Sequence, residues 1–166
     1  MSKRILLIRH AKSDWTNPKQ HDHDRELNKR GHLAAPEMAA RLKKRHIVPQ
    51  KLVSSTAVRA HTTANYFAET LGFRQDEIVL NSKIYEASTR TLLAEINKFK
   101  FEEDFIAMFG HNPGITMLAN ELCNGYIENV PTCGMILMEF PFEEWSMISK
   151  GTGEILFFDY PKAGED

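Results

Sequence analysis

The sequence predicts an α/β fold in which a mostly parallel central sheet lies between two layers of helices. Short unbroken apolar runs, such as residues 5–8 and 105–109, are typical of strands buried on both faces. These runs alternate with segments whose apolar residues recur at helical spacing. Only about thirteen residues separate the last two strand candidates, 135–140 and 154–160, too few for a helical crossover. We therefore expect a three-layer α/β/α sandwich with an antiparallel edge strand.

Length and composition predict one globular domain over residues 1–166. Hydrophobic residues make up 42% of the chain and charged residues 26%, with a formal net charge of -1. This balance predicts neither a nucleic-acid nor a membrane partner, and no apolar run approaches the length of a membrane span. The apolar run after the N-terminus is too short for a signal peptide, so we expect a cytoplasmic protein. Cys123 and Cys133 would then be free thiols.

The first half of the chain predicts two strand-helix units. After the strand at 5–8, Asn28 is a candidate N-cap for a helix that ends with basic residues. Pro36 lies inside this pattern, so we expect a kink or a late helix start. A second strand at 51–55 leads into a helix for which Gly72 is a C-terminal stop.

The second half repeats the pattern. A strand candidate at 78–80 is followed by Ser88, a plausible cap for the next helix. The apolar strand at 105–109 precedes Asn112, which can cap, and Pro113, which suits the first position of a helix.

The chemistry-bearing residues begin where the first strand ends, at Arg9 and His10. The carboxyl ends of parallel strands are where open α/β sheets place their ligands. Imidazole can act as a nucleophile, and a guanidinium grips a phosphoryl group through paired hydrogen bonds. The alternative is a polar strand end without a function.

Two further residues follow other strands in the same way. Arg59 falls in the first turn of a helix, where the helix dipole disfavours a cation, and such local conflicts are frequent at functional sites. His111 follows the strand at 105–109 as His10 follows the first strand. Both histidines would then lie at the same edge of a parallel sheet, where the carboxyl ends of its strands meet. A surface salt bridge for Arg59 and a structural histidine at 111 are the alternatives.

The segment from His21 to Asp24 contains four potential metal ligands in a row. Consecutive residues cannot easily all face one ion, and no other ligand cluster supports them. We therefore expect a solvated loop and no metal or other cofactor.

Three motifs together carry a resemblance to a known family: Arg9-His10-x-x-Ser13, the stretch 55–64 around Arg59, and Gly110-His111. The set resembles the histidine phosphatase superfamily, which has the phosphoglycerate mutase-like fold, over nearly the whole chain. Within it, the small size and the Asp-Arg-x-Leu-Asn segment at 24–28 are most similar to the SixA-type phosphohistidine phosphatases.

This resemblance implies roles for seven residues. His10 matches the nucleophile that becomes phosphorylated. The remaining matches are pocket residues and a candidate acid: Arg9, Arg59 and His111 in the phosphate pocket, Ser13 as a further pocket residue, Arg25 as a rim contact or merely a loop salt bridge, and Glu86 near the acid that protonates the leaving group.

The chain also departs from the family pattern. Ala11 replaces the usual glycine after the histidine, and Thr16 stands where mutases have a pocket asparagine, unless Asn17 supplies that contact. Both differences argue against a mutase.

The absence of long insertions predicts an open site, which suits a phosphohistidine on a protein. An imidazole leaving group needs little help from a general acid. The acid could therefore be Glu86 or Asp14, or the reaction could proceed without one. A phosphatase of small phosphomonoesters and a phosphate-binding module without turnover are the alternative functions.

Overall fold

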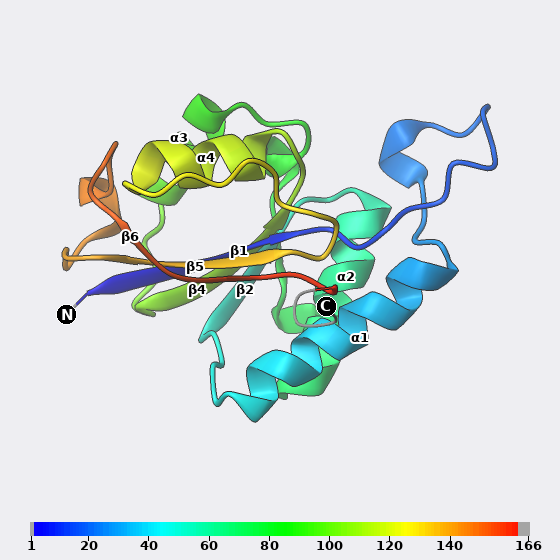
Figure 1. Cartoon of the computed structure of the whole chain (residues 1–166), viewed down its shortest axis with the longest axis horizontal. Coiled ribbons are helices and arrows are strands. Elements are labelled where there is room, and N and C mark those ends of the chain that lie inside the picture. The colour runs from blue at the N-terminus through cyan, green and yellow to red at the C-terminus, as the bar shows by residue number, and fades with distance from the viewer. Residues whose placement is uncertain (1, 163–166) are drawn as a thin grey trace.

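The computed structural model describes residues 2–162, which form one twisted sheet with helices on both faces (Figure 1). Its strands and α-helices, in chain order, are β1 (Lys3–Arg9), α1 (Lys29–Lys44), β2 (Lys51–Ser54), α2 (Val58–Leu71), β3 (Val79–Leu80), α3 (Thr89–Asn97), β4 (Phe105–Gly110), α4 (Gly114–Leu122), β5 (Met135–Phe140) and β6 (Glu154–Asp159).

The strand order is β3-β2-β4-β1-β5-β6. The pairs β2–β3, β2–β4 and β1–β4 are parallel, whereas β5 pairs antiparallel with both β1 and β6. Figure 1 shows α1 and α2 on one face of the sheet and α3 and α4 on the other. The predicted three-layer sandwich is confirmed, as is the antiparallel pair at its edge. β1 and β4 lie in the centre, so the residues that follow them emerge side by side.

β1 is buried on both faces, as its unbroken apolar run predicts. Ile5 and Leu7 pack into the core beneath α3 and α4, whereas Leu6 and Ile8 pack against α1 and α2. All four side chains are inaccessible to solvent. Burying a side chain of this size contributes about 1.5–3 kcal/mol, so β1 is a rigid support for whatever follows it.

The helix ends agree with the predicted signals, with two corrections. The Asn28 side chain accepts a hydrogen bond from the Gly31 amide, and Gly72 ends α2 in the left-handed conformation with φ of 88°. The late start predicted from Pro36 is wrong, because α1 begins at Lys29 and continues through the proline. α4 begins at Gly114, one residue after Pro113.

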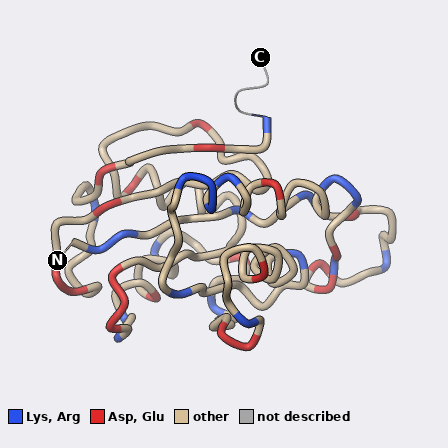
Figure 2. The backbone as a smooth tube through the Cα atoms, turned by 90° about the horizontal axis from the view of Figure 1, so that it is seen from below, with Lys and Arg blue, Asp and Glu red and all other residues tan. Residues whose placement is uncertain are grey.

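Charged residues of both signs are interspersed along the backbone, as Figure 2 shows for one view of the chain. Among the described residues, 2–162, no helix has the length and apolar character needed to cross a membrane.

Candidate active site

The predicted site residues converge at the carboxyl ends of β1, β2 and β4, around a cavity of about 460 Å³. Its lining contains all seven predicted site residues and five others: Arg9, His10, Lys12, Ser13, Trp15, Asp22, Arg25, Arg59, Glu86, His111, Asn112 and Thr132. The residues selected from the sequence therefore lie together at one cavity, and their catalytic roles stay a prediction. The five others include one residue, Asp22, that turns out to organise the cations.

His10 directly follows β1 and is 7% exposed. Its Nδ1 lies 2.7 Å from the carbonyl oxygen of Ala11. A carbonyl oxygen only accepts, so Nδ1 carries the proton, and the neutral ring has its lone pair on Nε2. The backbone thus fixes the tautomer in which Nε2 is free to attack.

The environment keeps both pocket histidines neutral. Burial, followed by the charges of Arg59 and Arg9, lowers the pKa of His10 to about 4, against the opposing effect of the hydrogen bond to Ala11. Burial, then His10 and Arg59, lowers the pKa of His111 to about 3. The two rings lie 5.2 Å apart between centroids. At neutral pH the pocket therefore holds two uncharged imidazoles among guanidinium groups.

His111 follows β4, and its orientation is set by Ser55 at the end of β2. The Nε2 atom of His111 lies 2.7 Å from Ser55 Oγ, which also accepts the Ala57 amide at 3.2 Å. We assign the Ser55 hydroxyl proton to the bond with Nε2. The neutral ring then carries its proton on Nδ1, a buried atom without a hydrogen-bond partner among the described residues.

Arg9 and Arg59 each retain unused donors. Arg9 donates from Nη1 to the carbonyl oxygen of Val130 at 3.0 Å. Arg59 donates from both Nη atoms to Asp22, at 2.6 Å to the backbone oxygen and 2.8 Å to Oδ2. In both residues Nε is buried and unpartnered among residues 2–162. Burial, then the charge of Arg59, lowers the pKa of Arg9, but a guanidinium stays protonated in proteins.

Asp22 explains how a cation is tolerated in the first turn of α2. Its carboxylate accepts hydrogen bonds from Arg59, from Arg25 Nε at 3.0 Å and from the Tyr85 hydroxyl at 2.6 Å. Burial acts to raise the pKa of Asp22, but the bonds from Tyr85, Arg59 and Arg25 outweigh it and hold that pKa well below its usual range. Burial, then the bond to Asp22, raises the pKa of Tyr85 to about 12.

The expectation of a merely solvated loop at 21–25 is therefore wrong in part. Asp22 belongs to a short 3-10 helix, η1 (Asp22–Asp24), and Arg25 is 6% exposed. The sequence contained one usable signal: the unfavourable position of Arg59 requires a nearby anion. Among residues 2–162, no group of three or more His, Cys, Asp or Glu side chains is arranged to hold a metal ion.

Arg25 lies on the rim of the pocket between Ser13 and Trp15. It donates from Nη1 to Ser13 Oγ at 2.5 Å, and its guanidinium carbon lies 3.4 Å from the centroid of the Trp15 ring. Trp15 is itself 75% exposed. Both predicted alternatives for Arg25 are thus present, since it is a rim residue that also forms a loop salt bridge with Asp22.

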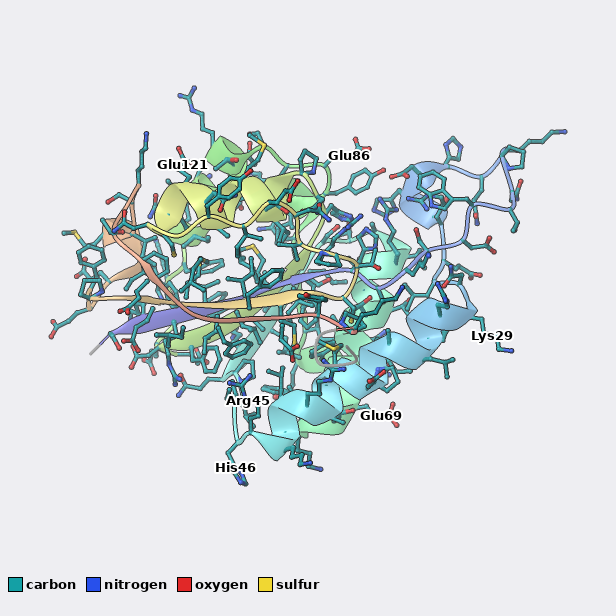
Figure 3. The ribbon with its side chains drawn as sticks, in the orientation of Figure 1. Lys29, Arg45, His46, Glu69, Glu86 and Glu121 are labelled. Carbon is teal, nitrogen blue, oxygen red and sulfur yellow. The ribbon has the colours of Figure 1, made fainter. Side chains whose placement is uncertain are left out.

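The candidate acids occupy different places. Glu86 lines the pocket and has a backbone φ of 51°, a left-handed conformation that is strained for a glutamate. Figure 3 shows it on the α4 side of the sheet, at the end where β1 finishes. Asp14 is not in the lining, and its Oδ1 accepts the Thr16 amide. Asn17 is likewise absent from the lining and accepts the Lys19 amide.

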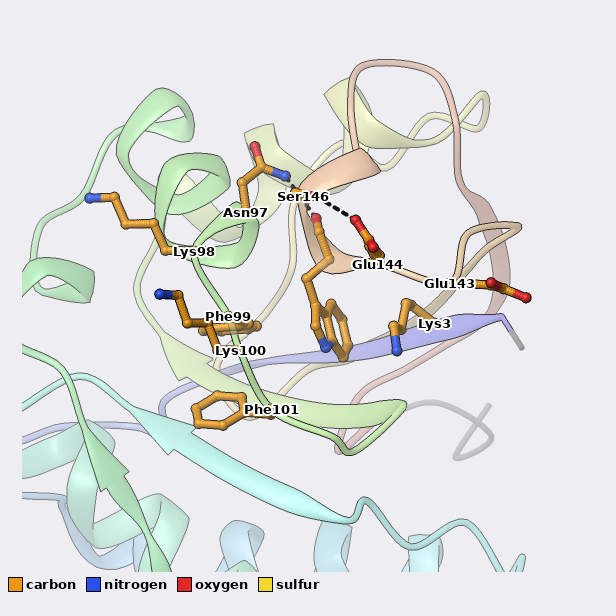
Figure 4. Close-up of a pocket in the computed structure, with 10 residues that line it drawn as sticks. Lys3, Asn97, Lys98, Phe99, Lys100, Phe101, Glu143, Glu144 and Ser146 are labelled. Atoms are coloured by element: carbon orange, nitrogen blue, oxygen red, sulfur yellow. Dashed lines mark hydrogen bonds between the residues drawn. The ribbon is translucent and has the colours of Figure 1, made fainter.

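A second hollow, of about 410 Å³, lies at the opposite end of the sheet (Figure 4). Lys3 at the start of β1 pairs there with Asp104 at 2.5 Å. Asn97 donates to the backbone oxygens of Trp145 and Ile148, both at 2.9 Å. None of the predicted site residues lines this hollow, and these contacts join the end of α3 to the segment before β6.

Comparison with solved structures places the fold among phosphatases. A protein assigned as phosphohistidine phosphatase SixA from Agrobacterium tumefaciens is 26% identical, with a TM-score of 0.77 over 96% of this chain and 98% of that one. The protein histidine phosphatase SixA complexed with tungstate gives a TM-score of 0.80 at 18% identity, over 95% and 97% of the two chains. A mycobacterial glucosyl-3-phosphoglycerate phosphatase gives 0.67 at 17%, over 94% and 98%.

Sequence comparison agrees with the fold. An uncharacterized chloroplastic protein of Arabidopsis thaliana is 30% identical over an alignment of 153 residues that covers 87% of this chain and 70% of that protein. The family model of the histidine phosphatase superfamily (branch 1) matches residues 5–91, a stretch that contains His10, Arg25 and Arg59. With the site geometry and the fold in agreement, the chain belongs to the histidine phosphatase superfamily.

Proposed function

We propose that this phosphatase hydrolyses phosphohistidine in proteins, through a phosphorylated intermediate on its own His10. The observation that carries the proposal is a set of three buried, unpartnered nitrogen atoms that belong to residues lining the pocket that holds His10. They are Nε of Arg9, Nε of Arg59 and Nδ1 of His111. An unmade bond at a buried donor costs about 1–3 kcal/mol, and a phosphoryl group supplies three acceptor oxygens.

The first chemical step follows from the tautomer of His10. Its Nε2 lone pair attacks phosphorus and forms an N–P bond, while the bond from phosphorus to the leaving group breaks and that group departs with the electron pair. The ring then carries the phosphoryl group on Nε2 and a proton on Nδ1, held by Ala11. In the second step water attacks phosphorus, the N–P bond breaks, and His10 and inorganic phosphate are released.

Charge stabilisation comes from Arg9, Arg59 and the Nδ1–H of His111. Phosphoryl transfer requires mainly positioning and neutralisation of the equatorial oxygens. Both guanidinium groups are fixed beforehand by acceptors outside the substrate, Val130 for Arg9 and Asp22 for Arg59. Donors fixed in this way need no reorganisation during the reaction, so the electrostatic role that metal ions have elsewhere falls to them.

The leaving group decides between the two enzymatic functions. The pocket is open, with an exposed Trp15 on its rim, which supports a protein-borne phosphoryl group. Asp22 is fully engaged in ion pairs, so Glu86 is the carboxylate at the wall that remains available as an acid. An imidazole leaves with little help from an acid, whereas an alkoxide requires protonation. The strained backbone of Glu86 favours the second candidate, a phosphatase of small phosphomonoesters.

Two pairs of measurements test this proposal. His10→Asn is expected to abolish turnover and the acid-labile phosphoryl label retained on the quenched protein. His46→Asn, an exposed histidine at a left-handed position that asparagine tolerates, is the matched control and is expected to keep both. Full turnover in His10→Asn would refute the covalent mechanism.

Glu86→Gln separates the substrate classes. We expect it to lower kcat/KM for an alkyl phosphate at least tenfold, within the usual contribution of a general acid, and to leave a phosphohistidine peptide nearly unaffected. An equal loss on both substrates would remove the reason to prefer phosphohistidine. If the wild-type protein hydrolyses the alkyl phosphate but not the phosphohistidine peptide, the second candidate, a phosphatase of small phosphomonoesters, is favoured.

A further inference from the structure

A carboxylate lies in a pocket that is otherwise built to attract an anion. Asp22 is among the lining residues together with Arg9, Arg25 and Arg59. A negative charge at this position opposes the entry of a phosphoryl dianion, and the usual requirements of phosphoryl transfer give it no role. Its bonds to two arginines at 2.8 and 3.0 Å identify it as a specific arrangement of the site.

Asp22 holds Arg59 and Arg25 in place and uses only some of their donors. A guanidinium has five N–H donors. Arg59 gives two of them to Asp22 and Arg25 gives one, with a second bond from Arg25 to Ser13. Three donors on each arginine are therefore left over. The two long side chains, both at least 94% buried, are held in place before a ligand arrives.

The support of Asp22 itself comes from outside the pocket. The Tyr85 hydroxyl donates to Oδ2, the same oxygen that accepts from Arg59, while Arg25 bonds to Oδ1. Tyr85 packs edge-on against His23 of η1, with centroids 4.9 Å apart, and His23 Nε2 lies 2.9 Å from Thr56 Oγ1. The loop that carries Asp22 is thus attached at two points to the start of α2.

We infer that Asp22 is a positioning residue for Arg59 and Arg25 whose negative charge also weakens the hold of the pocket on inorganic phosphate, so that product is released. The inference rests on the proposed function, because that function makes inorganic phosphate the product. Without Asp22, three guanidinium groups would face a phosphate with Glu86 as the remaining carboxylate in the pocket lining. By Coulomb's law, removing one carboxylate about 6 Å from a dianion raises the affinity for that dianion about tenfold at an effective dielectric constant of about 80, the value for a water-filled pocket.

Asp22→Asn separates charge from position, because an amide keeps the shape and one acceptor oxygen. We expect Asp22→Asn to bind inorganic phosphate about tenfold more tightly by titration calorimetry at fixed ionic strength, and to show an equal fall in the competitive inhibition constant. Asp24→Asn removes the same charge from the same short helix outside the pocket lining, where Asp24 is exposed. Its phosphate affinity is expected to stay within twofold of wild type.

Asp22→Ala tests the positioning role. It removes the acceptor as well as the charge, so kcat is expected to fall at least tenfold below that of Asp22→Asn, while phosphate binding remains tighter than in wild type. Equal kcat values in the two variants would refute the positioning role. If Asp22→Asn fails to fold by circular dichroism, phosphate binding by Asp22→Ala answers the question of charge.

Unchanged or weaker phosphate binding in the folded variants would overturn the inference. Calorimetry requires no turnover, so its result is separate from that of the proposed function. Tighter binding in a protein that does not hydrolyse phosphohistidine would leave the role of Asp22 intact and refute the substrate. If neither the wild-type protein nor Asp22→Asn binds phosphate, the inference is overturned, whereas the proposed function is still decided by turnover.

Discussion

Because two histidines are buried, we predict that the free energy of unfolding decreases as the pH falls. This decrease begins well above the pH at which the carboxylates are protonated. Burial is the main reason that the pKa of His10 falls to about 4 and that of His111 to about 3. An unfolded histidine has a pKa of about 6.5. As the pH falls below 6.5, the unfolded chain binds protons that the folded chain does not, so stability decreases until the folded histidines are also protonated.

The magnitude follows from these values. At pH 5 the unfolded state gains about 2 kcal/mol from each histidine, because each pH unit below 6.5 is worth about 1.4 kcal/mol. The folded state gains almost nothing at this pH. His10 and His111 together therefore lower the free energy of unfolding by up to about 4 kcal/mol between pH 7 and pH 5, with coupling between the rings reducing the sum. Asp22 acts in the same direction but only at lower pH, since its folded pKa is depressed.

Urea unfolding followed by circular dichroism at pH 7 and pH 5 measures this difference. In His10→Asn we expect the pH-dependent loss to fall to about half of the wild-type value, whereas the control His46→Asn keeps it in full. A loss as large in His10→Asn as in wild type would refute the claim that His10 is buried in its neutral form. A wild-type protein equally stable at both pH values would refute it for both histidines.

Three further predictions follow from the surroundings of the site. Gly31→Ala would place its Cβ 2.2 Å from the backbone oxygen of Lys12, so we expect the free energy of unfolding in urea to fall by about 1–3 kcal/mol. The comparison variant is Gly72→Ala, where φ is 88° and the space is open, and there we expect a smaller loss of roughly 1 kcal/mol from backbone strain. Trp15→Ala removes the ring stacked on Arg25 and is expected to raise KM about two- to fivefold, from a cation–π contribution of about 0.5–1 kcal/mol; an unchanged KM would show that the stacking is dispensable. Turnover is expected to persist in a strong chelator, because fixed guanidinium groups stabilise the transferring charge; loss of turnover, restored by a divalent metal, would contradict this.

The fold was predictable because its strongest signals are local. The four apolar residues before Arg9 are typical of a strand buried on both faces, and the structure divides them between the two cores. Asn28 and Ser88 begin helices because their side-chain oxygens accept a backbone amide, and Gly72 ends one because it adopts the left-handed conformation, so these positions were correct. The late start predicted from Pro36 was wrong because the packing of α1 outweighs the lost hydrogen bond.

The site was predictable where residues follow buried strands and not where a loop folds back. His10 and His111 are located by the strands before them, and Arg59 by its conflict with the helix dipole. Asp22 stands among four potential ligands in a row, and no local pattern distinguishes it from its neighbours. Its partners Arg59 and Tyr85 lie 37 and 63 residues further along the chain. Only the tertiary structure brings these groups together.

The same arrangement explains why the site costs stability and why the chain tolerates it. Each catalytic candidate is fixed by a group that does not react: His10 by Ala11, Arg9 by Val130, and Arg59 by Asp22. These bonds compensate part of the cost of burying three polar side chains, but Nε of Arg9, Nε of Arg59 and Nδ1 of His111 have no hydrogen-bond partner among the described residues. Under the proposed function, a phosphoryl group that accepts hydrogen bonds from these atoms would offset the cost of leaving them unpartnered. Hydrogen bonds that form only with the reacting phosphoryl group stabilise the transition state more than the ground state, and such bonds accelerate a reaction.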